Sequence, residues 1–268
     1  MNTDLSPHRK QRARWIVLAW LLTMTSGALA ASLIRLPTGI PGNPSLWFLA
    51  HGVIAIAMGS AVIGHLVRAH ATGRLAPALF VAATFVCGVF VVRSFEPLTS
   101  AAHAALAAYA ALALASTGTG GMSGMVIGRP GGRSWQASVA GVGVVLLILQ
   151  IALGALVRHH LIGYGLHLLV AGLTALAILV PAVAASQEPG ATAVLKRAAR
   201  LAIATLLVQL SLGVAVLFMI LTGTASVYGW LLTTVTHVVA GTITLLAAAR
   251  LAQVLRTRPA VETISTAR

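Results

Sequence analysis

Long apolar runs separated by short polar segments dominate this sequence. A helix needs about 20 apolar residues to cross a bilayer, and eight runs are long enough: 15–35, 46–67, 76–93, 99–116, 137–157, 163–185, 200–221 and 228–250. Lipid offers backbone N–H and C=O groups no hydrogen-bond partner, so each run is expected to be helical. The pattern predicts an all-α polytopic membrane protein with eight transmembrane helices.

Composition supports a bilayer rather than water as the solvent. The chain is 58% hydrophobic and 8% charged, and its mean hydropathy is +0.94. These values exclude an ordinary soluble domain. The formal net charge of +14 would suit nucleic acid, but the basic residues lie between apolar runs and form no stripe on a soluble surface. We therefore expect the lipid bilayer, and no nucleic acid, as a partner.

The basic residues also predict the orientation. On the eight-helix pattern, Arg35, Arg93 and Arg158 lie on one side of the membrane and the other lysines and arginines on the opposite side. Positive residues favour the cytoplasmic side, so both termini are expected in the cytoplasm, with the chain in the cell inner (plasma) membrane. The basic lead and apolar stretch from Trp15 to Ala31 would also suit a cleaved signal peptide. Because the run continues to Arg35, we interpret it as the first helix.

A boundary between two halves is predicted at residues 117–136, which are rich in Gly, Ser and Arg and contain no spanning run. Such a composition is typical of a flexible linker. The predicted parts are a cytoplasmic lead (1–14), a first four-helix bundle (15–116), the linker (117–136), a second four-helix bundle (137–250) and a cytoplasmic tail (251–268).

Short repeats support two related halves. The segment from Gln150 to Arg158 matches that from Gly27 to Arg35 in layout, with small residues at Gly154 and Ala31. Three odd-numbered runs place a polar residue four positions before a glycine: Thr84–Gly88, Gln150–Gly154 and Gln209–Gly213. The repeated unit is therefore a helix pair.

The second member of each helix pair carries a histidine near its outer end: His51, His103, His167 and His237. Two histidines at similar depth on facing helices could bind the two axial faces of a haem iron. The predicted pairs are His51 with His103 and His167 with His237. A single buried histidine is more often a helix-to-helix hydrogen-bond donor, but four at equivalent positions favour ligation. Guanidinium pairs well with carboxylate, so Arg35, Arg93 and Arg158 are the candidate partners of haem propionates.

Over nearly its whole length the chain resembles the haem A synthase family, eight-helix proteins with two related four-helix halves. The resemblance depends on the Leu33–Arg35 and Gln150–Arg158 helix ends, the Gln209–Gly213 segment and the four histidines. It implies a haem-dependent oxidoreductase that oxidises the C8 methyl of haem O to the formyl group of haem A. By resemblance, His51 and His103 hold the substrate haem and act as the catalytic pair, and His167 and His237 hold haem b. Haem O synthase and terminal-oxidase assembly proteins are the implied partners.

The chain departs from the family at two places. Phe48 stands three residues before His51, where family members carry a glutamate. Many members have two cysteines in an outer loop, whereas this chain has a single cysteine, Cys87, inside the third run. No internal disulfide is possible. Glu96 is the one acidic residue expected on the outer side.

Three other functions are compatible with parts of the pattern. The missing glutamate favours a non-catalytic haem carrier for oxidase assembly. A cytochrome relaying electrons across the membrane would need a second histidine pair near the cytoplasm, but the position equivalent to His65 in the fourth run is Thr117. A repeat-built transporter would favour carboxylates at mid-depth, and the runs contain none there.

Overall fold

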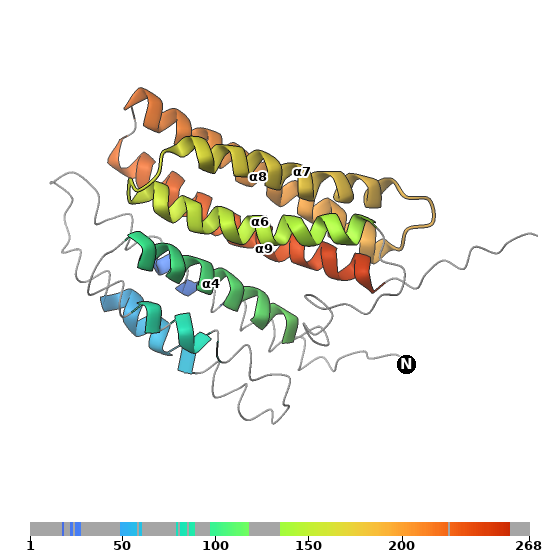
Figure 1. The fold of residues 1–268 in the computed structure, drawn as a ribbon, viewed down its shortest axis with the longest axis horizontal. Helices are drawn as coiled ribbons and strands as arrows, with labels where there is room; N and C mark the ends of the chain where they lie inside the picture. The colour runs from blue at the N-terminus through green and yellow to red at the C-terminus, as the bar shows by residue number, and fades with distance from the viewer. Residues whose placement is uncertain are drawn as a thin grey trace, which may run out of the picture.

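The computed structural model describes residues 18, 22–23, 25–27, 49–57, 59–60, 79, 81–84, 86–88, 97–117 and 135–257 except 225. Within these ranges the secondary structure is helical, without strands. The long helices are α4 (Pro97–Thr117), α6 (Trp135–Arg158), α7 (Tyr164–Gln187), α8 (Ala193–Thr222) and α9 (Val227–Arg256) (Figure 1). The all-α prediction is confirmed for this part of the chain. The predicted lead, most of the first three runs, the linker and residues 258–268 lie outside it.

The last two helices are longer than their apolar runs. Helix α8 begins at Ala193 rather than at 200, because the Thr192 side chain caps it by accepting a hydrogen bond from the Leu195 N–H. Helix α9 continues to Arg256 rather than ending at 250. Leu251 and Leu255 are buried, so the first residues of the predicted tail belong to the packed helix.

Helices α6 to α9 form a four-helix unit in which α6 packs on α7 and α9, and α8 packs on the same two helices. Short connections make chain neighbours antiparallel. Gly223 ends α8 in the left-handed conformation (φ 63°), and its N–H donates to the Met219 carbonyl. Helix α4 packs on α6 and, less extensively, on α9, on the side away from α7 and α8 (Figure 1).

All four helices of this unit are long and apolar enough to cross a membrane. The membrane prediction is thus supported, and the four-helix arrangement of the second half is observed. The eight-helix, two-bundle arrangement extends beyond the described residues and stays a prediction.

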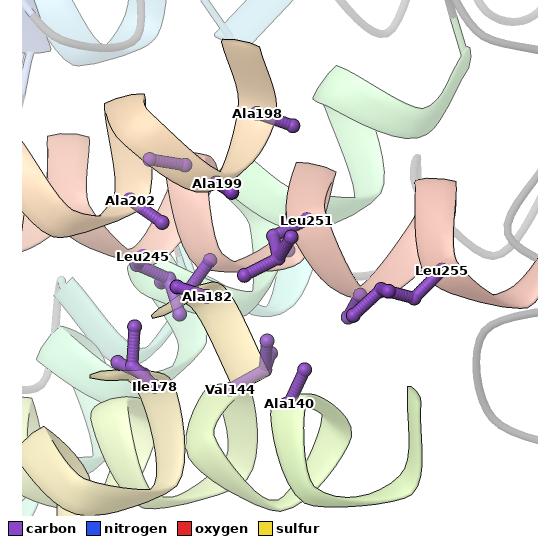
Figure 2. Close-up of a cluster of buried hydrophobic side chains, with 14 of the residues drawn as sticks. Ala140, Val144, Ile178, Ala182, Ala198, Ala199, Ala202, Leu245, Leu251 and Leu255 are labelled. Atoms are coloured by element: carbon purple, nitrogen blue, oxygen red, sulfur yellow. The ribbon is translucent and has the colours of Figure 1, made fainter. Parts of the chain in front are cut away.

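The aliphatic core occupies one end of the unit, which we call the basic end because Lys196, Arg197, Arg200, Arg250 and Arg256 lie there. Figure 2 shows side chains from the four helices converging in this core. Ile178, Leu195, Leu245 and Leu251 are almost completely buried among alanines. The small residues let the helices approach closely: a Cβ at Gly143 would lie 2.9 Å from Ile178 Cγ1.

The opposite end, which we call the histidine end because it carries His167 and His237, is packed differently. Residues 207–222 of α8 and the described side chains of α9 before Gly241 include no fully buried residue. A hydrogen bond from Thr244 Oγ1 to the Thr205 carbonyl (3.0 Å) joins α9 to α8 near the start of the aliphatic core. Within α8 and α9 the fully buried aliphatic side chains therefore lie at the basic end, whereas Leu153 and Ala155 of α6 and Val170 of α7 are buried at the histidine end.

Candidate functional site

Each of the four predicted histidines packs against a glycine of the preceding run. A Cβ added to Gly27, Gly88, Gly154 or Gly213 would lie 2.8, 3.0, 3.3 or 3.2 Å, respectively, from Cε1 of His51, His103, His167 or His237. In all four contacts Cε1 is the ring atom nearest to that Cβ. The four imidazoles therefore present the same edge to the preceding helix, as expected of a repeated helix pair.

These contacts correct one detail of the sequence alignment. The layout of the first and fifth runs matched Gly154 with Ala31, but Gly27 is the residue in contact with His51. Gly27 lies four residues before Ala31 in the sequence. Because the position against the histidine ring requires a residue without Cβ, Gly27 rather than Ala31 is the counterpart of Gly154.

Two hydrogen bonds of the Ser26 hydroxyl position the proton of His51. The Ser26 hydroxyl donates to the Thr23 carbonyl (2.8 Å), and the same oxygen lies 3.0 Å from His51 Nδ1. With its hydrogen used on Thr23, the hydroxyl oxygen is left to accept from Nδ1–H. A neutral imidazole protonated at Nδ1 has its lone pair on Nε2, which is the form that can bind a metal.

The proton of His103 is placed more directly. Nδ1 of His103 lies 3.0 Å from the backbone carbonyl oxygen of Thr84, four residues before Gly88. A carbonyl can only accept, so Nδ1 carries the proton and Nε2 keeps its lone pair. An acceptor behind a ligand histidine also fixes the ring and increases its basicity. These contacts favour the Nδ1-protonated form of both first-half histidines, which leaves Nε2 as the atom that can bind a metal.

The rings of His51 and His103 are spaced for one shared ion. Their centroids are 6.5 Å apart, and their planes are 83° to each other. Two imidazoles on opposite sides of a metal, with bonds of about 2.0–2.1 Å, have centroids roughly 6–6.5 Å apart. The predicted pairing of His51 with His103 thus fits a single metal between the two rings.

Glutamine side chains contact both histidines of the second pair. Gln150 Nε2 lies 3.0 Å from His167 Nδ1 and 3.1 Å from Nε2, and it donates to the His167 carbonyl at 3.0 Å. Gln209 Nε2 lies 3.4 Å from His237 Nε2. Both histidines are partly buried rather than exposed on the helix surface.

Of the three arginines predicted to meet propionates, Arg158 is the one in the described residues. It lies in the last turn of α6, four residues after Gly154, whose backbone lies against His167. Arg35 and Arg93 lie outside the described residues, as do Phe48 and Glu96. His160 is exposed in the turn after α6, with φ 54°. Cys87, the single cysteine, donates from Sγ to the Thr99 carbonyl of α4 (3.4 Å).

Within the described ranges no group of three or more His, Cys, Asp or Glu is placed to hold a metal. A porphyrin brings its own nitrogens and needs axial ligands alone. Histidine pairs with a residue without Cβ against each ring are compatible with the axial ligands of a haem.

Sequence reasoning found the histidines but not the groups that hold them. The glycines were visible as a repeat without a role, and Ser26 gave no signal because its partner His51 lies 25 residues away. The Thr84 acceptor is a backbone carbonyl, which no residue type reveals. Comparisons with protein-family models, curated proteins and solved structures found no match to this chain.

Proposed function

We propose that this protein is a membrane haem oxidoreductase of the haem A synthase type, which oxidises the C8 methyl of haem O to the formyl group of haem A. The observation that carries the proposal is the His51–His103 pair. Its rings are 6.5 Å apart, and each has an acceptor at Nδ1 that leaves Nε2 for iron. The orientation inferred from the basic residues puts this site toward the outer face of the inner membrane.

In this proposal each half has a distinct task. His51 and His103 hold the substrate haem O, and His167 and His237 hold a haem b. Arg158, in the last turn of α6, pairs with a propionate there, and Arg35 and Arg93 do so in the first half. Bound haem would supply the one-electron and oxygen chemistry that no protein side chain provides.

The chain's own residues position the reacting groups. Ser26 and the Thr84 carbonyl hold the Nδ1 protons, and Gly27 and Gly88 give the rings room against the preceding helices. Helices that face lipid also exclude water from the outer half of the site. Because Phe48 stands where the family has a glutamate, proton transfer in this chain does not use a carboxylate at that position.

A haem carrier for oxidase assembly is the second candidate, and Phe48 favours it. The test is expression in a bacterial strain that lacks haem A synthase and makes haem O. Haem A in extracts supports the enzyme. Haem O that co-purifies unchanged with the chain supports the carrier and contradicts the enzyme.

Haem binding itself is tested on purified protein from haem-replete cells. We expect a Soret band with low-spin bis-histidine features and a loss of haem in His103→Ala and His237→Ala. His160→Ala is the matched control, because this histidine is exposed in a turn. Colourless wild-type protein of normal stability would reject both the enzyme and the carrier.

A further inference from the structure

Three residues of the basic end are exposed: Arg197, Arg200 and Arg250. Arg197 and Arg200 are three residues apart and so are neighbours on the surface of α8. Arg200 is the first residue of the apolar run 200–221, and Arg250 is the last residue of the run 228–250. Arginines near the ends of apolar helices extend toward the membrane interface, so these side chains lie at the level of lipid headgroups. We call the three residues the arginine patch.

The contact between α8 and α9 sets the depth of each arginine. A hydrogen bond joins Thr244 of α9 to the Thr205 carbonyl of α8, and the two helices are antiparallel neighbours. At a rise of 1.5 Å per residue, Arg250 lies about 9 Å beyond this bond toward the basic end. By the same rise, Arg197 lies about 12 Å and Arg200 about 7.5 Å beyond it. The three arginines therefore lie within one helical turn of the same depth.

The rotation of each helix brings the arginines to one side of the α8–α9 pair. With 3.6 residues per turn, Arg250 lies about 120° around α9 from Thr244. Arg197 lies about 80° around α8 from Thr205. Because the helices run in opposite directions, these rotations bring both arginines to the same outward side of the pair. Leu245 lies on the opposite side, in the aliphatic core (Figure 2).

Exposed apolar side chains continue this outward side toward the middle of the helices. Leu201 and Val208 of α8 are 52% and 54% exposed, and Ile243 of α9 is 39% exposed. By the same helical geometry, these three residues lie on the side that carries Arg197 and Arg250. The surface thus has cationic groups at headgroup depth and an apolar strip next to them along the helices. A phospholipid has the same division between a charged headgroup and apolar chains.

The guanidinium groups retain donors for a headgroup. Arg200 Nε donates to the Lys196 carbonyl (3.3 Å). Arg250 Nη1 donates to Gln253 Oε1 (2.9 Å). A guanidinium has five N–H donors, and its planar fork binds phosphate through two parallel hydrogen bonds. Glu188 is the only acidic residue in the described ranges, so the basic end keeps a net positive charge that suits an anionic headgroup.

We propose that the arginine patch binds the headgroup of an anionic phospholipid, whose acyl chain lies along Leu201, Val208 and Ile243. The charge pattern of the sequence predicts that this end faces the cytoplasm, and the cytoplasmic leaflet carries anionic lipids. Each arginine near an anionic surface contributes about fivefold to the affinity. The proposal is independent of the haem sites, which lie at the other end of the helices.

The experiment measures binding of short-chain phosphatidylglycerol to the full chain in neutral detergent micelles by native mass spectrometry. Dissociation constants are compared for the wild type, Arg197→Gln, the double variant Arg197→Gln with Arg250→Gln, and the double variant Arg197→Lys with Arg250→Lys. Lys196→Gln is the matched control for Arg197→Gln. It removes one charge at the same depth of α8, but about 100° around the helix from Arg197. Short-chain phosphatidylcholine and inorganic phosphate are the comparison probes.

We expect Arg197→Gln to weaken phosphatidylglycerol binding about fivefold and the double glutamine variant about 25-fold. The double lysine variant should bind more tightly than the double glutamine variant, because it keeps both charges. Lys196→Gln should bind phosphatidylglycerol as the wild type does. Phosphatidylcholine and inorganic phosphate should each bind the wild type about tenfold more weakly than phosphatidylglycerol, or weaker still.

Several results would overturn the inference. Unchanged affinity in the double glutamine variant would show that the arginines do not contact the lipid. Equal losses in Arg197→Gln and Lys196→Gln would show general attraction to the basic end rather than a site. Equal affinity for phosphatidylcholine would assign binding to the apolar strip alone, and equal affinity for inorganic phosphate would leave the lipid no role. The haem spectrum of the wild type, which tests the proposed function, is measured separately and is not decided by any of these results.

Discussion

The glycine contacts of the histidines predict a graded loss of haem on substitution by alanine. Ordinary van der Waals contact begins at 3.4 Å, and a Cβ at Gly27 would lie 2.8 Å from His51 Cε1, so restoring ordinary contact displaces the ring by 0.6 Å. The corresponding shortfall at Gly154 is 0.1 Å, because its Cβ would lie 3.3 Å from His167. A ligand constellation tolerates displacements of about 0.5 Å. Gly27→Ala therefore exceeds the tolerance and Gly154→Ala does not.

A matched control separates this effect from helix propensity. Alanine is favoured over glycine in a helix by about 1 kcal/mol, and a Cβ at Gly172 of α7 would meet nothing within 4 Å. Gly172→Ala should therefore keep its haem and become more stable by up to about 1 kcal/mol. Gly27→Ala gains the same propensity, so a loss of haem there reports the contact with His51 and not a weakened helix.

The assay is the ratio of haem to protein after purification, measured as a pyridine haemochrome, in chains that carry His167→Ala and His237→Ala and so retain the first site. We expect Gly27→Ala to lose most of this haem and Gly88→Ala, with a Cβ 3.0 Å from His103, to lose less. The haem retained by Gly154→Ala is measured at the second site, in chains that keep His167 and His237. Equal haem retention in Gly27→Ala and Gly172→Ala would refute the steric argument.

Three further predictions test separate parts of the structure. Ser26→Ala removes the acceptor for His51 Nδ1–H and should weaken haem binding at the first site about 10- to 100-fold, whereas Ser26→Thr retains the hydroxyl and should restore it; titration with haem checks both. Leu245→Ala empties a completely buried position in the aliphatic core and should cost about 2–5 kcal/mol of unfolding free energy in a denaturation series. Its Soret maximum should not move, because the core and the histidine end are separate. Thr244→Val removes the hydroxyl that bonds the Thr205 and Ala240 carbonyls and should cost about 1 kcal/mol. Unchanged stability would show that the bond between α8 and α9 adds nothing to the free energy of unfolding.

The pattern of apolar residues determined the fold class and the existence of the helices. A run of lipid-soluble side chains long enough to span has no alternative to the helix, so α4, α6 and α7 begin and end within two residues of their runs. The ends of α8 and α9 were not predictable in this way. They depend on a threonine cap at 192 and on burial of Leu251 and Leu255 by neighbouring helices, and hydropathy detects neither.

The sequence by itself also identified the candidate iron ligands, because four histidines recur at one position of the predicted helix pairs. Only the tertiary structure decided how the imidazoles are held. Ser26, the Thr84 carbonyl and the glycines come from the preceding helix, so their roles depend on the helix rotation and crossing that bring them to each ring. That geometry is set by side-chain packing between helices, which a single sequence records only indirectly. The hydrogen-bond acceptor at Nδ1, which leaves Nε2 free to bind a metal, is therefore supplied by the packing of the two helices of each pair.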